Sequence, residues 1–150
     1  MSQEARPLEA VLDREIEVAR LLASTLAAER TALTGDTPDD VSRIAAEKIR
    51  LFEAFEKLDA QRRVISGDTE VPERANGGGQ GARAAVADRW RSLMELMAKC
   101  RTANEINGQI IHARRGQVRQ LIDIVRGGPA ITYNANGKTF SRALRALARA

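Results

Sequence analysis

Residues 86–125 read VADRWRSLMELMAKCRTANEINGQIIHARRGQVRQLIDIV, and this stretch decides the fold. Its face-forming positions recur in alternating steps of three and four residues, which is the spacing of a long coiled-coil-like helix. These positions, here called the seam, are Val86, Trp90, Leu93, Met97, Cys100, Asn104, Asn107, Ile111, Arg114, Val118, Leu121 and Val125. Gly127-Gly128-Pro129 is expected to end this helix, which would be roughly 60 Å long at 1.5 Å per residue.

Two shorter helices of roughly 45 Å are expected before it. The first spans residues 4–33, where Leu12, Ala19, Leu26 and Leu33 recur every seven residues, and Gly35 stops it. The second spans residues 38–65, with Thr37 as its cap, Pro38 in its first turn and two aspartates at its positive end. Two adjacent rows of residues with seven-residue spacing lie on this helix. One row is Val41, Lys48, Phe55 and Arg62, and the other is Ile44, Leu51, Leu58 and Ile65. Phe52 and Ile49 add bulk near these rows. The short connection between these two helices predicts an antiparallel hairpin. The third helix is expected to pack along this hairpin and to extend beyond its end.

Residues 66–82, SGDTEVPERANGGGQGA, have no hydrophobic periodicity and are expected to form a flexible linker. No Lys-Ser or Lys-Thr follows their glycines, so they do not match a phosphate-binding loop. Residues 129–150 form a tail with an Asn-Gly turn signal and a short terminal helix over 142–150 that is marginal alone. The expected fold is therefore an all-α, antiparallel three-helix bundle over residues 1–128 with an extended C-terminal tail.

The composition excludes several other classes of protein. Aromatic residues make up 3% of the chain, which argues against a sheet protein, and no apolar run approaches the roughly 20 residues of a membrane span. The N-terminal residues MSQEARPLEA lack the apolar core of a signal peptide, so a cytoplasmic location is expected. The net charge of +4 is uneven: residues 1–66 carry 10 basic and 13 acidic side chains, whereas residues 89–150 carry 12 and 3. This asymmetry indicates either an anionic or acidic partner, or attraction between the two halves of the chain.

No catalytic residue, cofactor or metal site is predicted. The single cysteine, Cys100, lies on the seam, where a small buried hydrophobe is the ordinary interpretation, and the single histidine, His112, is expected on the helix surface. About 18 Å of helix separates the two, which prevents a nucleophile–base pair within one chain. Glu105 and Asp123 interrupt the basic stripe and no stacking aromatics lie beside it, so nucleic-acid binding is only a minor alternative.

Asn104, Asn107 and Gly108 form the polar motif of the seam. Asparagine and glycine are poor helix formers, and a sequence selected only for bundle stability would not place them there. One interpretation is a polar layer that sets the register of the bundle, as buried asparagines do in coiled coils. The other is the close approach of another chain at Gly108.

Three segments together resemble the FlgN-type flagellar export chaperones. They are residues 104–108 (NEING), residues 121–128 (LIDIVRGG) and residues 132–139 (TYNANGKT), and residues 28–33 and 58–63 of the hairpin are also similar. Asn134 stands where the family often has glycine, and asparagine tolerates the positive φ of a turn.

The resemblance implies a cytoplasmic chaperone for the hook–filament junction proteins FlgK and FlgL, whose C-terminal segments it holds before type III export. It implies substrate binding by the tail helix around Phe140, Leu144 and Leu147, and also by Leu121 and Val125 at the end of the third helix. It further implies docking at the export-gate component FlhA through Tyr133, with Asn134 and Gly137 in the same turn. The alternative is a coiled-coil scaffold or adaptor that self-assembles through the third helix. The sequence leaves open whether the chain forms a homodimer.

Overall fold

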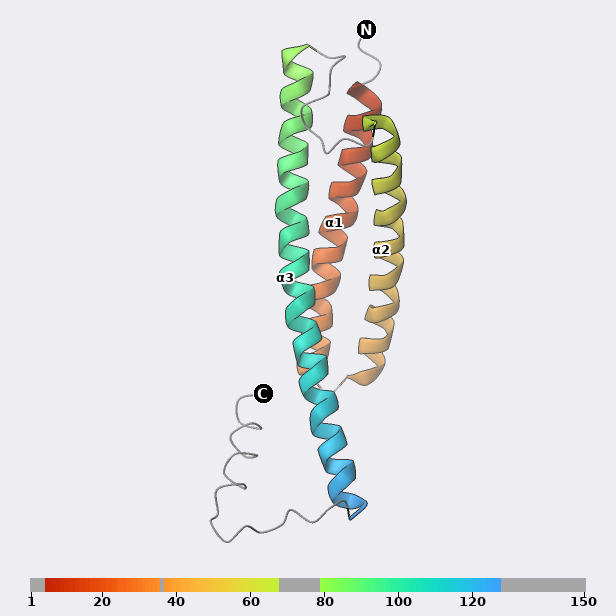
Figure 1. Cartoon of the computed structure of the whole chain (residues 1–150), viewed down its shortest axis with the longest axis vertical. Helices are drawn as coiled ribbons and strands as arrows, with labels where there is room; N and C mark the ends of the chain where they lie inside the picture. Colours follow the sequence, from red (N-terminus) through yellow and green to blue (C-terminus); the bar gives the residue numbers. More distant parts are fainter. Residues whose placement is uncertain (1–4, 36, 68–78, 128–150) are drawn as a thin grey trace. The chain divides into compact units, whose positions relative to one another are not determined.

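The computed structural model describes residues 5–35, 37–67 and 79–127. These residues form three helices, α1 (Ala5–Thr34), α2 (Pro38–Ser66) and α3 (Gln80–Val125), and no strand (Figure 1). The all-helical prediction is thus confirmed for the described part of the chain. The chain divides into two units, with the boundary inside α3 after Glu105.

Both ends of α2 follow from the local sequence. Pro38 opens the helix and Asp39 and Asp40 lie in its first turn, as predicted. Thr37 occupies the N-cap position, but the expected side-chain cap is absent: its hydroxyl makes no capping hydrogen bond, and its backbone carbonyl instead accepts from the Val41 N–H at 3.3 Å. At the other end Gly67 has φ +69°, a left-handed conformation that glycine adopts without steric penalty, and its N–H donates to the Arg63 carbonyl.

The helix α3 is longer than predicted at its start. It begins at Gln80, and the Gly79 carbonyl accepts from the N–H groups of Ala82 (3.0 Å) and Arg83 (3.3 Å). The expected linker of residues 66–82 is therefore too wide at both ends, because Ser66 closes α2 and residues 80–82 already belong to α3. Gln, Ala and Arg are good helix formers and extend the helix backwards from the seam. At its far end Gly127 adopts φ +65°, in agreement with the predicted end.

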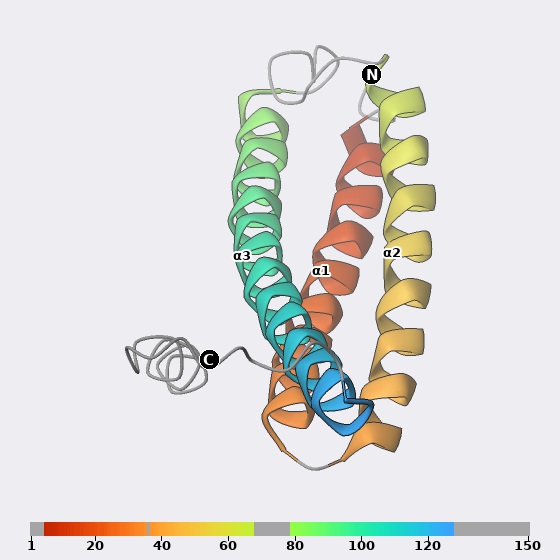
Figure 2. The same ribbon diagram turned by 60° about the horizontal axis from the view of Figure 1, so that its bottom comes forward.

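The core of the unit that ends at Glu105 is built around α1. One cluster joins α1 to the first half of α3 through Leu8, Leu12, Ile16, Ala19, Val86 and Leu93, all buried. A second cluster joins all three helices through Leu22, Leu26, Leu51 and Cys100. In Figures 1 and 2 α1 correspondingly lies between α2 and this part of α3. The predicted structural role of Phe52, Phe55 and Trp90 is confirmed, because all three pack against these clusters.

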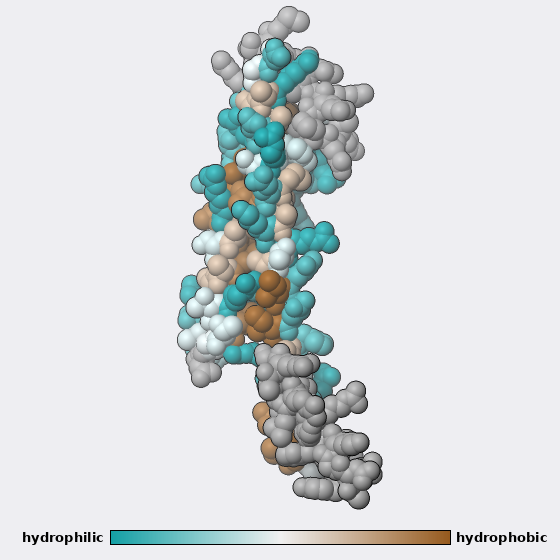
Figure 3. All heavy atoms as spheres, turned by 90° about the vertical axis from the view of Figure 1, so that its left-hand side faces the viewer, coloured by the Kyte–Doolittle hydropathy of each residue, from teal (hydrophilic) through white to brown (hydrophobic). Residues whose placement is uncertain are grey.

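The α1 and α2 helices run antiparallel, as the order of their ion pairs shows. Glu29 near the end of α1 pairs with Lys48 of the first half of α2, whereas Glu15 pairs with Arg62 near the end of α2. The expected apolar rows of α2 hold at Ile44, Leu51 and Leu58, which are buried. The second row is not buried at Ile65, and Ile49 is likewise exposed. Polar side chains cover most of the face drawn in Figure 3, with smaller apolar patches between them.

Candidate functional site

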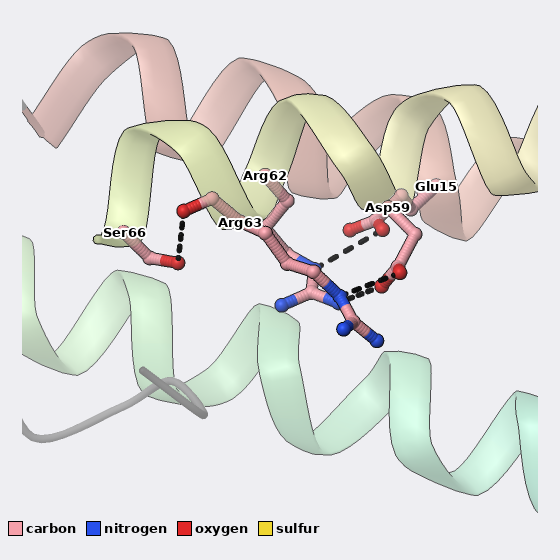
Figure 4. Close-up of polar contacts among 5 residues, drawn as sticks. All are labelled: Glu15, Asp59, Arg62, Arg63 and Ser66. Atoms are coloured by element: carbon pink, nitrogen blue, oxygen red, sulfur yellow. Dashed lines mark hydrogen bonds and ion pairs between the residues drawn. The ribbon is translucent and has the colours of Figure 1, made fainter. Parts of the chain in front are cut away.

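A buried polar cluster lies near the C-terminal end of α2 and contacts all three helices; Figure 4 shows its members from α1 and α2. Arg62 of α2 donates from Nε to Oε1 of Glu15 in α1 at 3.1 Å, and its Nη2 pairs with Asp59 one turn earlier. The Arg62 guanidinium also lies over the ring of Trp90 in α3, 4.8 Å from the ring centre. One arginine therefore contacts a carboxylate of α1, a carboxylate of α2 and an aromatic face of α3, which fixes the rotation of all three helices about their axes.

Of the charged groups in this cluster, Glu15 has the least favourable electrostatic surroundings. Its side chain is fully buried, and Oε2 has no hydrogen-bond partner among the described residues. Burial raises the pKa of Glu15 above its ordinary value, an effect larger than the opposing attraction of Arg62. The Glu15 carboxylate therefore binds a proton more tightly in the folded chain than in the unfolded chain.

A second polar layer lies nearer the connection between α1 and α2. Lys48 donates from Nζ to Glu29 at 2.7 Å and to the side-chain oxygen of Asn104 at 3.5 Å. The Glu29 side chain is only 2% exposed, so this ion pair is largely removed from water. Sequence reasoning singled out neither buried glutamate, although a signal was present: Leu12, Glu15, Ala19 and Leu22 follow the same alternating steps as the seam, as do Leu26, Glu29 and Leu33.

Attraction between the acidic and basic halves of the chain is visible at one place. Arg89 of α3 pairs with Asp13 at 2.8 Å and with Glu9 at 3.7 Å, both on α1. These three side chains are partly or fully exposed, and exposed ion pairs contribute about 0.2–1 kcal/mol each. The pairs therefore favour the observed α1–α3 arrangement modestly, in line with one of the two interpretations of the uneven charge.

The single cysteine lies in the buried core, and the single histidine lies on the exposed surface of α3. Cys100 is buried with Sγ 3.5 Å from the Ala19 carbonyl, and burial raises the pKa of its thiol, which disfavours the reactive thiolate. His112 lies on the exposed helix surface, as expected. Within residues 5–35, 37–67 and 79–127, no cluster of His, Cys, Asp or Glu is suited to hold a metal ion.

The polar motif of the seam is only partly buried. Asn107 is fully buried, whereas Asn104 is exposed at the edge of the bundle, where it accepts from the Lys48 ammonium group. Of the two seam asparagines, only Asn107 is therefore buried. Gly108 is exposed, and a Cβ added there would meet no atom within 4 Å, so no described part of this chain approaches it closely.

The last turns of α3 carry an exposed apolar face. Its residues, here called the C-terminal stripe, are Val118, Leu121, Ile122 and Val125. They are spaced i, i+3, i+4 and i+7, which places them on one side of the helix, and all four are exposed, up to 84% at Val125. Two of them, Leu121 and Val125, are predicted substrate-binding residues. Val118 and Ile122 were not predicted to bind substrate. The seam spacing could have identified Val118, which is a seam residue.

The remaining predicted site residues lie outside the described residues. These are the substrate-binding Phe140, Leu144 and Leu147, and the gate-docking Tyr133, Asn134 and Gly137. Of the residues predicted to bind substrate, only the two on α3 are described.

Comparison with protein families gives a match that spans nearly the whole chain. The family model of the FlgN protein matches residues 1–140. No curated protein and no solved structure matches this chain. No described helix is long and apolar enough to cross a membrane. With a match over so much of its length, the chain belongs to the FlgN family of flagellar export chaperones.

Proposed function

We propose that this protein is a cytoplasmic chaperone that binds the C-terminal segments of the hook–filament junction proteins FlgK and FlgL. It keeps these segments unassembled and delivers them to the export gate at FlhA. Membership of the FlgN family supports the general role, and the exposed C-terminal stripe is the observation that carries the binding assignment. Large exposed apolar side chains that line one face of a helix are typical of a surface that pairs with another amphipathic helix.

The stripe fits this role better than it fits a role in folding. Val118, Leu121 and Val125 continue the seam, but all three stay more than half exposed. Burial of one such side chain contributes about 1.5–3 kcal/mol. Docking of a substrate helix on these positions would release that free energy on binding and would require no nucleotide.

Substrate binding is tested by calorimetry with a synthetic C-terminal peptide of FlgK or FlgL. The double variant Leu121→Glu/Val125→Glu should lose at least about tenfold in affinity, because two charges would be buried against apolar partner groups. The matched control is Ile49→Glu/Val64→Glu, which changes two exposed apolar residues of α2. Equal affinity of the two double variants would contradict the assignment.

The contribution of the tail is tested by truncation after Gly128. The shortened chain should lose peptide binding while it keeps most of its far-UV helical signal, since α1, α2 and α3 all end before that residue. Tyr133→Ala should leave peptide affinity unchanged and should weaken the binding of the loaded chaperone to the cytoplasmic part of FlhA. Equal FlhA affinity of mutant and wild type would remove Tyr133 from the docking site.

A self-assembling scaffold is the second candidate, and it is favoured by the same exposed stripe. Analytical ultracentrifugation separates the two. A stable oligomer that Leu121→Glu/Val125→Glu dissociates, together with no affinity for either junction peptide, would support the scaffold instead.

A further inference from the structure

The C-terminal stripe is bordered differently on its two sides. At 3.6 residues per turn, Arg115, Arg119 and Arg126 fall within about 40° of one another around the helix axis, along one border of the stripe. Gln117, Gln120 and Ile124 lie on the opposite border. The first set, here called the arginine edge, consists only of cations, whereas the second set carries no charge.

One acidic residue lies next to the arginine edge and offsets its charge only in part. Residues 106–127 contain four arginines and one acidic residue, Asp123, which lies on the far side of the arginine edge from the stripe. His112 lies beside the same edge, and Arg114 lies within the stripe itself. Arg115, Arg119 and Arg126 are exposed, as are the four residues of the stripe.

We infer that the arginine edge selects the partner of the stripe and sets its direction. The partner is an amphipathic helix whose apolar face is bordered by Asp or Glu on one side only. This inference rests on the proposed function and specifies the chemistry of the segment that the stripe binds. Carboxylates on one side of the incoming helix meet the arginine edge when the helix docks in one direction, and they meet the uncharged border when it docks in the other.

The physical reason is that the two surfaces contribute different properties. Apolar contact is not directional and accepts any amphipathic helix. Charge complementarity adds less affinity, but it speeds association and discriminates between partners and between orientations. Arginine suits this task because its planar guanidinium binds carboxylates through two parallel hydrogen bonds.

The test uses the full chain and three synthetic 20-residue helical peptides with the same leucine face. One carries Glu along one border, the second carries the same residues on the other border, and the third carries Gln at those positions. Fluorescence anisotropy at 50 and 300 mM NaCl measures their affinities. We expect the two Glu peptides to bind at least about tenfold tighter than the Gln peptide at 50 mM, and less so at 300 mM. Paramagnetic labels at one peptide terminus should broaden opposite ends of the stripe for the two Glu peptides.

The matched pair of variants separates local contact from net charge. Arg115→Glu/Arg119→Glu/Arg126→Glu should abolish the preference for Glu peptides and leave affinity for the Gln peptide within about twofold. The control Arg14→Glu/Lys57→Glu/Lys99→Glu makes the same change in charge at exposed positions elsewhere and should keep the preference. Arg115→Gln/Arg119→Gln/Arg126→Gln, which retains good helix formers, should show an intermediate effect.

Several outcomes would overturn the inference. Equal effects of the two reversed triples would assign the preference to net charge alone, and equal affinity of wild type for all three peptides would remove the selectivity. Tighter, salt-sensitive binding of a 20-nucleotide single strand that the arginine-edge variant abolishes would identify nucleic acid as the partner instead. Binding of a FlgK or FlgL peptide without discrimination among the designed peptides would contradict this inference alone. Discrimination without any binding of those two peptides would contradict only the proposed function.

Discussion

The two parts of α3 carry the same seam spacing, but the apolar seam residues near its two ends differ in burial. Up to Glu105, the seam residues Val86, Leu93 and Cys100 are at most 3% exposed, because α1 covers them. After Ile106, the seam residues Val118, Leu121 and Val125 are more than half exposed. The spacing therefore identifies a helix face that is stabilised by burial, but it does not identify the surface that covers this face. In the first part that surface belongs to the same chain, and in the second part we assign it to a partner.

The largest expected difference lies between a buried arginine of α2, in the unit that ends at Glu105, and an exposed arginine in the second part of α3. Arg62→Ala should lower the free energy of unfolding by about 3–5 kcal/mol, because it leaves the buried Glu15 carboxylate without its counter-ion. Arg115→Ala, in the exposed part of α3, should change it by no more than about 0.5 kcal/mol. Urea denaturation followed by circular dichroism measures both. Similar losses for the two variants would show that the buried pair does not hold the helices together.

The leucines of the two parts should differ almost as strongly. Leu93→Ala removes a fully buried side chain from the α1–α3 cluster and should cost about 2–5 kcal/mol of stability. Leu121→Ala, at a position 61% exposed, should cost no more than about 0.5 kcal/mol in the same denaturation experiment. If Leu121→Ala proved as damaging as Leu93→Ala, the stripe would be part of the folded core and unavailable to a partner.

Glycine substitutions should stabilise the second part of α3. Gly108 and Gly116 lie in the helix with no atom within 4 Å of an added Cβ, so alanine at either position should gain about 0.5–1 kcal/mol. Amide hydrogen exchange of residues 106–120 should slow by roughly two- to fivefold for each change. Gly67→Ala is the control with the opposite sign, because its positive φ strains any other residue. Weaker junction-peptide binding by Gly108→Ala alone would support the close approach of another chain at Gly108.

The smallest expected effect is a change in the pH dependence of stability, and it concerns Glu15 of α1, in the unit that ends at Glu105. Because the pKa of Glu15 is raised on folding, the folded state holds this proton more tightly than the unfolded state. The contribution of Glu15 to stability therefore increases as the pH falls from neutral towards 4.5, its ordinary value, and decreases as the pH rises through the folded-state pKa. The stability of Glu15→Gln relative to wild type should accordingly rise with pH across this window. Glu17→Gln, at an exposed position, should keep the wild-type profile, and parallel profiles for all three proteins would contradict the raised pKa.

Much of the fold could be predicted from the sequence because helix formation and termination are local. The predicted ends of α1 and α2 agree with the structure to within one residue, since Gly35, Pro38 and Gly67 end or begin helices by their own backbone preferences. The start of α3 was predicted less well, because glycines in residues 76–81 obscure a helix that good helix formers extend.

The candidate site could be predicted only in part. Leu121 and Val125 were predicted from the resemblance to the FlgN family; both continue the periodic seam, and both are exposed. The exposure of Asn104 and its contact with Lys48 of α2 could not be predicted, because they depend on how the neighbouring helices cover the seam. The arginine edge is encoded in the sequence, but it has meaning only when the adjacent stripe is known to be exposed.

The sequence by itself determined the helices, their approximate ends and the faces that gain from burial, because these depend on residues at most a few turns apart. Only the tertiary structure decided which charged side chains enter the core. Glu15, Glu29 and Arg62 are buried because α1 and α2 run antiparallel in a register that brings each glutamate opposite a cation. The tertiary structure also decided that burial of the α3 seam stops short of the C-terminal stripe, because burial requires a neighbouring surface and periodicity alone does not supply one.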